Sequence, residues 1–81
     1  MVARVAKLLL DLSQDGRQPI DRGQHTIQEM SEMVATTPEA ISRSLNVIKN
    51  SGAISVNRGK IMVISIEKLA TLAQVEPIYS E

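Results

Sequence analysis

Apolar and polar positions recur along this chain with two different periods, and the change of period separates its predicted elements. Over residues 1–13 and again over residues 26–51, apolar side chains return every three or four positions, which is typical of helices with one side facing a core. Over residues 53–65 they alternate every second position, which predicts a β-hairpin. The pattern therefore predicts a mainly α domain with a small hairpin.

The segment from Thr37 to Asn50 is predicted to form a helix with two unlike faces. At 3.6 residues per turn, its core-facing side gathers Ala40, Ile41, Ser44, Leu45 and Ile48. Its opposite side gathers Glu39, Ser42, Arg43, Asn46 and Asn50, with Lys49 at the edge and no large apolar side chain between them. Amide, hydroxyl, carboxylate and guanidinium groups can hydrogen-bond base edges in a major groove of DNA.

Residues at both ends mark the limits of this helix. Thr37 can cap it through its hydroxyl, and Pro38 suits the first helical position, where no N–H is needed. Gly52 is the residue best able to take the left-handed conformation that follows a helix. The helix limits that these end residues indicate therefore agree with the extent of the apolar stripe.

A shorter helix is predicted just before, beginning at Thr26, which has the spacing of a capping box with Glu29. Its apolar stripe consists of Ile27, Met30 and Val34. Met30 and Met33 are interpreted as core filler. Only residues 35–37 separate the two helices, which suits a helix-turn-helix over residues 26–51.

The other segments complete a single domain over residues 1–81. The broad apolar face of helix 1–13 is expected to pack on the helix-turn-helix, with a second chain or an upstream domain as the alternative. Residues 14–24 form a polar connection with Ile20 as an anchor, and a short strand over residues 23–26 is expected to join the hairpin. A last helix, capped by Ser65, is predicted over residues 66–74, with a tail over residues 75–81.

Composition limits the kinds of function that the chain can have. It has no Cys, one His, one Tyr and no Phe or Trp, so the core must be aliphatic and thiolate metal sites are excluded. There is no catalytic constellation and no Gly-rich phosphate loop, so we expect neither an enzyme, nor a metal, nor a cofactor. No targeting or membrane-spanning segment is visible, and a cytoplasmic location is the simplest expectation.

The distribution of charge is more informative than the formal net charge of zero. From residue 40 to residue 66 no acid occurs, and the charged residues are Arg43, Lys49, Arg58 and Lys60. A basic middle third in a neutral protein suits phosphate binding. Arg58 and Lys60 flank Gly59 in the hairpin turn, where they are either merely solvated or able to reach a phosphate.

The same residues carry a resemblance to a known family. The stretches 26–30 and 37–43, with Val34 between them, resemble the helix-turn-helix of the CRP/FNR family of bacterial transcription regulators, and the likeness continues through residues 51–54 and 58–60. Glu39, Ser42 and Arg43 resemble the FNR branch. Pro38 departs from the patterns of both this branch and the cyclic-AMP receptor branch. The resemblance implies a winged helix-turn-helix that binds double-stranded DNA, with the hairpin as its wing.

Roles for individual residues follow from the chemistry of DNA together with this resemblance. We expect Arg43 to read guanine, Glu39 to accept from cytosine and Ser42 to touch a thymine or a neighbouring base. The backbone or supporting contacts are expected from Thr26, Gln28, Thr37, Pro38, Asn46, Arg58 and Lys60. The resemblance implies a half-site like TTGAT in a two-fold symmetric operator, read by the helix of residues 37–50.

The resemblance also implies partners outside this chain. Family members sense a signal through an upstream domain joined by a long dimer helix, so we expect a homodimeric parent protein from which Met1 marks a cut. RNA polymerase is a further candidate partner. The alternative function is a winged helix that binds another protein, with its polar helix face simply solvated; salt-sensitive binding to duplex DNA distinguishes the two.

Overall fold

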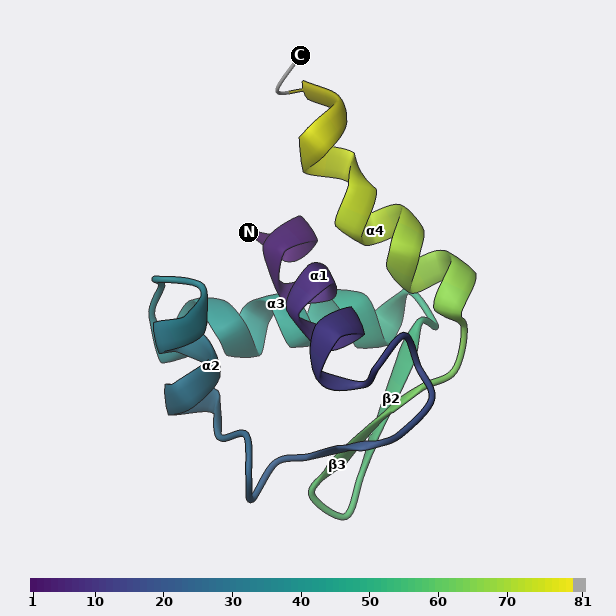
Figure 1. The fold of residues 1–81 in the computed structure, drawn as a ribbon. Coiled ribbons are helices and arrows are strands. Elements are labelled where there is room, and N and C mark those ends of the chain that lie inside the picture. Colours follow the sequence, from purple (N-terminus) through teal and green to yellow (C-terminus); the bar gives the residue numbers. More distant parts are fainter. Residues whose placement is uncertain (80–81) are drawn as a thin grey trace.

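Four helices pack beside a small sheet that lies at one edge of the computed structural model, which describes the backbone of residues 1–79 and the side chains of residues 1–73 (Figure 1). The elements in chain order are α1 (Val2–Leu12), β1 (Ile20–Asp21), α2 (Ile27–Met33), α3 (Pro38–Asn50), β2 (Ile54–Asn57), β3 (Lys60–Val63) and α4 (Ile66–Tyr79). The arrangement is a winged helix-turn-helix: α2 and α3 form the helix-turn-helix, and β2 and β3 form the wing.

The helix-turn-helix begins and ends at the residues that the sequence indicated. Thr26 Oγ1 accepts from the Glu29 N–H at 3.1 Å, and Thr37 Oγ1 accepts from the Ala40 N–H at 3.2 Å. Each hydroxyl thereby satisfies one of the free N–H groups of a first helical turn. Gly52 follows α3 with φ +90°. Both caps and the left-handed glycine are confirmed.

The turn between α2 and α3 has a backbone geometry that glycine would favour. The Thr36 N–H donates to the Ser31 carbonyl at 2.8 Å and the Ala35 N–H donates to the Glu32 carbonyl at 3.3 Å. These two hydrogen bonds form a Schellman motif, whose left-handed position is usually glycine. Here it is Ala35, with φ +53°. The turn that sets the direction of α3 therefore contains a residue, Ala35, with strained backbone.

Replacing Ala35 with glycine should raise the free energy of unfolding by about 0.5–1 kcal/mol. Glycine removes the left-handed strain of about 1–2 kcal/mol, and the greater freedom of the unfolded chain returns about 0.4–1 kcal/mol of that gain. Chemical denaturation measures the change. Ala40→Gly is the matched control in the first turn of α3, where the backbone is right-handed and the same substitution should destabilise by up to about 1 kcal/mol. Destabilisation by Ala35→Gly would show that the left-handed turn carries no strain.

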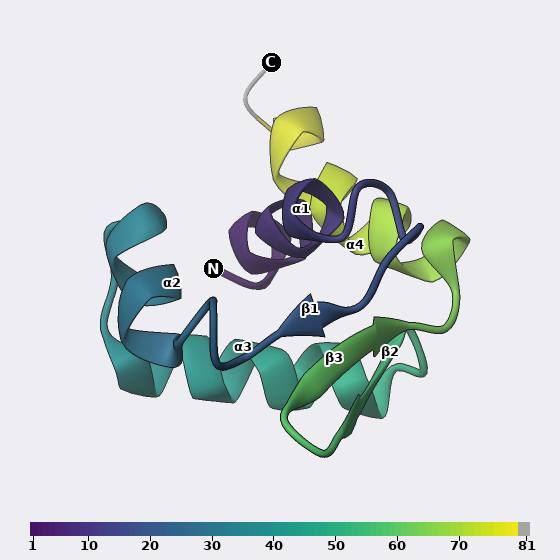
Figure 2. The ribbon, with the colours of Figure 1, turned by 60° about the horizontal axis from the view of Figure 1, so that its bottom comes forward.

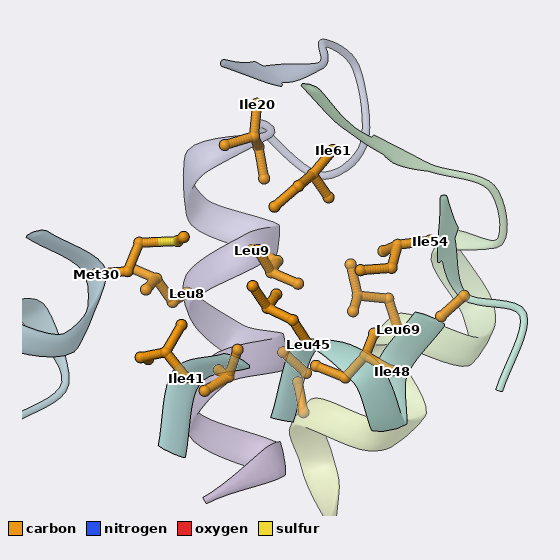
Figure 3. Packing of buried hydrophobic residues seen from close by; sticks show 14 residues of the cluster. Leu8, Leu9, Ile20, Met30, Ile41, Leu45, Ile48, Ile54, Ile61 and Leu69 are labelled. Atoms are coloured by element: carbon orange, nitrogen blue, oxygen red, sulfur yellow. The ribbon is translucent and has the colours of Figure 1, made fainter. Parts of the chain in front are cut away.

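An aliphatic core lies between α1, α3, α4 and the sheet. Its largest fully buried side chains include Leu9, Ile20, Met30, Ile41, Ile48, Ile54, Ile61 and Leu69. In Figure 3, Leu9 of α1 lies in the middle of this cluster, with Met30 of α2 on one side and Ile54 of β2 on the other. The apolar face of α1 packs against α3 and α4, so the expected packing within the domain is confirmed.

The sheet has the strand order β1-β3-β2, with both pairs antiparallel. Val56 of β2 and Ile20 of β1 both lie opposite Ile61, which is fully buried. Met62 and Ile64 point to the exposed side, as the alternation predicted. The sheet is thus one layer over the core, and its hairpin extends beyond it (Figure 2).

Two expectations about side chains and strands are wrong. The third strand is β1 at Ile20–Asp21 and not residues 23–26, because the latter form a turn in which the N–H groups of Gln24 and His25 both donate to the Asp21 carbonyl. Met33 is 51% exposed and is not core filler. The short helix α2 buries Met30, one turn before Met33, and the side of the helix that carries Met33 faces solvent.

The expected end of the last helix is also wrong. Ser65 Oγ accepts from the Lys68 N–H at 3.3 Å as predicted, but α4 continues to Tyr79 instead of ending at residue 74. The predicted tail begins too early for that reason, and residues 80–81 lie outside the described residues. Only two residues of α4 follow Pro77, so a proline at this place interrupts no more than the last turn of the helix.

Candidate nucleic-acid interface

The polar face of α3 lies on the outside of the molecule. Figure 2 shows α3 along the lower edge with α1 above it, while the tip of the hairpin reaches lowest. Ile41, Leu45 and Ile48 are buried, and the face opposite them is exposed along its length. The exposed residues are Glu39, Ser42, Arg43, Asn46, Lys49 and Asn50. All three residues expected to read bases therefore project from one accessible face.

One apolar side chain flanks this face. Val47 is 47% exposed and lies one helical turn after Arg43. The expected absence of large apolar side chains holds for the centre of the face but not for this edge. The exposure of Val47 could have been inferred from its separation from the stripe of Ile41, Leu45 and Ile48. An apolar group at this place can contact a thymine methyl.

The supporting residues expected at the starts of α2 and α3 differ in their availability. Thr26 and Thr37 are exposed, and each hydroxyl accepts a capping hydrogen bond while its own proton remains to be donated. Gln28 is exposed, with its Nε2 donating to Glu32 Oε2 at 3.5 Å. Pro38 is half-buried at the first position of α3. The two threonines are thus the better placed donors for a phosphate.

The hairpin ends in a two-residue turn with left-handed backbone at both positions. Arg58 has φ +51° and Gly59 has φ +76°, the signature of a type I′ turn, whose twist matches that of the strands. Arg58 and Lys60 are exposed beside it. Lys60 also lies opposite Asp21 of β1, so the fold brings an acid next to a window that contains none in sequence.

A hollow of about 220 Å³ separates α3 from the wing. Its apolar lining comes from Ile27, Leu45 and Val56, and its polar lining from Arg22, Ser42, Asn46 and Lys49. Arg22 belongs to the connection that sequence reasoning treated as carrying only the anchor Ile20. Its position beside the hollow depends on the pairing of Ile20–Asp21 with β3, whereas the third strand was expected at residues 23–26.

The single histidine lies just before α2. His25 Nδ1 is 3.2 Å from Glu29 Oε1, on the turn before α2. The carboxylate of Glu29 therefore contacts the histidine ring, while its backbone N–H is capped by Thr26. Among the residues that the structure describes, no cluster of His, Asp or Glu could hold a metal ion.

Comparison with known families gives one match that covers most of the chain. Residues 3–72 match the model of the Crp-like helix-turn-helix domain, a span that runs from α1 into α4 and includes the whole interface. Comparison with curated proteins finds no match. No helix within the described part of the chain is long and apolar enough to cross a membrane.

Proposed function

Because the chain belongs to the family of Crp-like helix-turn-helix domains, which bind DNA in transcription regulators, we propose that it reads a specific duplex sequence through α3. The exposed polar face of α3, opposite its buried stripe, is the observation that carries the proposal. A major groove admits one helix, and this face offers it hydrogen-bonding groups for base edges. The interaction uses the protein's own side chains and calls for no cofactor.

Three side chains are assigned to bases. Arg43 forms a bidentate pair with guanine O6 and N7, the commonest specific contact in such complexes. Glu39, in the first turn of α3, accepts from a cytosine N4 amine. Ser42 contacts a thymine or the neighbouring base. Since these residues resemble the FNR branch, the half-site of the proposal is TTGAT-like.

A second set of residues holds the backbone and sets the register of α3. Thr26, Gln28 and Thr37 approach phosphates from the starts of α2 and α3, where N–H groups and the helix dipole also favour an anion. Pro38 supports the start of α3 and Asn46 approaches the backbone one turn deeper. Arg58 and Lys60 contribute positive charge from the wing.

The proposal places the domain in a larger assembly. In a homodimeric CRP/FNR-type regulator, two copies bind the halves of a two-fold symmetric operator, and an upstream domain joined by a dimer helix supplies the signal. RNA polymerase is a candidate partner at a regulated promoter. Such a regulator acts on the bacterial chromosome, so its site of action is the cytoplasm.

Selection from random duplexes, followed by salt titration with wing variants, tests the proposed function. The domain should enrich a TTGAT-like half-site, and its log affinity should fall linearly with log salt because phosphate contacts release counterions. Arg58→Ala and Lys60→Ala should each lower affinity for every duplex to a similar degree and reduce the salt slope by about 1.

Arg17→Ala is the matched control for charge, since Arg17 is exposed in the connection before β1 and belongs to none of the proposed contacts. Its salt slope should equal that of the wild type. Failure to enrich any sequence, combined with salt-independent binding, would contradict DNA recognition. Unchanged slopes for both wing variants would contradict the role of the hairpin tip alone.

A further inference from the structure

We propose that the hollow between α3 and the wing is a binding site for one phosphate of the DNA backbone, and that Arg22 is the residue that holds it. This inference rests on the proposed function and adds a site to it. The hollow measures about 220 Å³, roughly seven times the 30 Å³ that a water molecule occupies in the liquid. It therefore has room for a phosphate group with part of its hydration.

The position of Arg22 is set by the backbone of the wing. Its N–H donates to the Gly59 carbonyl at 2.8 Å, which ties the residue to the hairpin turn. The side chain is half-buried and lines the hollow. The preceding acid, Asp21, has its Oδ1 engaged by the Gly23 N–H at 2.8 Å. Arg22 is thus anchored to the wing through its backbone and lines the hollow together with residues of α3.

The lining of the hollow suits an anion. An apolar base from Ile27, Leu45 and Val56 lowers the local dielectric constant, which strengthens a charge pair formed above it. The cations come from both sides, Arg22 from the connection and Lys49 from α3, and no carboxylate is among the described lining residues. Asn46, already assigned to the backbone, adds a neutral hydrogen-bond donor.

The placement of the hollow explains why the ligand is a backbone phosphate and not a base. At roughly 100° per residue, Lys49 lies about 120° around α3 from Arg43, on the side of the wing. When Arg43 faces base edges, Lys49 therefore faces the strand that borders the groove. That strand must pass between α3 and the wing, over the hollow. A planar guanidinium matches phosphate oxygens in a bidentate pair.

A thermodynamic cycle tests the site with the duplex that the domain itself selects. Single phosphates along this duplex are replaced, one at a time, by uncharged methylphosphonates, and binding is measured for the wild type, Arg22→Ala and the control Arg17→Ala. At one flanking position the wild type should lose roughly 5- to 10-fold in affinity at about 0.1 M salt, the value expected for one neutralised phosphate. Arg17→Ala should show the same loss there.

Arg22→Ala should already lose roughly 5- to 10-fold on the unmodified duplex, with unchanged base preference, and should lose nothing more when that one phosphate is neutral. Additive losses at every position, or wild-type affinity of Arg22→Ala, would overturn the inference. If Arg22→Ala merely folded less well, it would bind the unmodified and the methylphosphonate duplex more weakly by the same factor. The two losses would then be additive, and the inference would be overturned in the same way. If the wild type binds no duplex in a salt-dependent manner, the proposed function itself fails.

Discussion

Replacing Arg43 with alanine should lower affinity for the preferred duplex by about 1–3 kcal/mol, roughly 5- to 150-fold, and abolish preference at one base pair. The reason is geometric, since a bidentate guanidinium recognises guanine O6 and N7 together and no smaller group can replace both hydrogen bonds. Arg43 is exposed on α3, so the free energy of unfolding should barely change. Titration of the preferred duplex and its single-base variants measures both effects.

Arg43→Lys is the sharper control because it keeps the charge and loses the planar fork. It should retain the salt slope while losing most of the discrimination at that base pair. Lys49→Ala on the same helix should weaken all duplexes alike, since Lys49 lies toward the hollow. If Arg43→Ala weakened every single-base variant equally, Arg43 would be a phosphate contact and the assignment of bases to α3 would be wrong.

Joining two copies through a dimerising segment should raise affinity for a two-half-site duplex by about 10²–10⁴ without any new DNA contact. The second binding event becomes intramolecular, provided that the two α3 helices can lie about 34–36 Å apart, one DNA turn between half-sites. Most of the apolar face of α1 is covered by α3 and α4 within the domain. Met1 is 42% exposed and offers a point of attachment.

Sedimentation of the free domain and titration with one and two half-sites measure this effect. We expect the free domain to be mainly monomeric and to bind each half-site weakly. Shifting the half-sites apart by half a DNA turn should remove most of the gain from linking, because the second α3 would then face the wrong side of the duplex. A free domain that sediments as a stable dimer and binds the full operator cooperatively would contradict the prediction.

Local signals predicted much of the fold and the candidate face of α3. The hydroxyls of Thr26 and Thr37 cap the helices that they were expected to cap, and Gly52 adopts the expected left-handed backbone. Such features depend on residues three or four apart, so the sequence contains nearly all the information that they need. The wrong end was the C-terminal end of α4, which was expected at residue 74 and lies at Tyr79.

Side chains at the margins of elements were harder to predict. Met33 belongs to an apolar pattern but is half exposed, because seven residues of α2 bury only the row that includes Met30. Val47 was overlooked beside a polar face for the related reason that a helix has flanks as well as two sides. Whether a side chain at the flank of a helix is buried depends on how close the neighbouring element lies. The sequence of the helix does not specify that distance.

The sequence by itself determined which face of α3 is polar, where α2 and α3 begin, and that a basic turn joins two strands, since each follows from periodicity or from a cap. Only the tertiary structure decided what surrounds that face. Ile20 pairs with Ile61, and this pairing fixes where the connection before α2 lies on the sheet. It places Asp21 opposite Lys60 and Arg22 beside the hollow. Ile20 and Ile61 are 41 residues apart in the chain, and their contact results from burying Ile20 in a shared core, a long-range effect that no local pattern specifies.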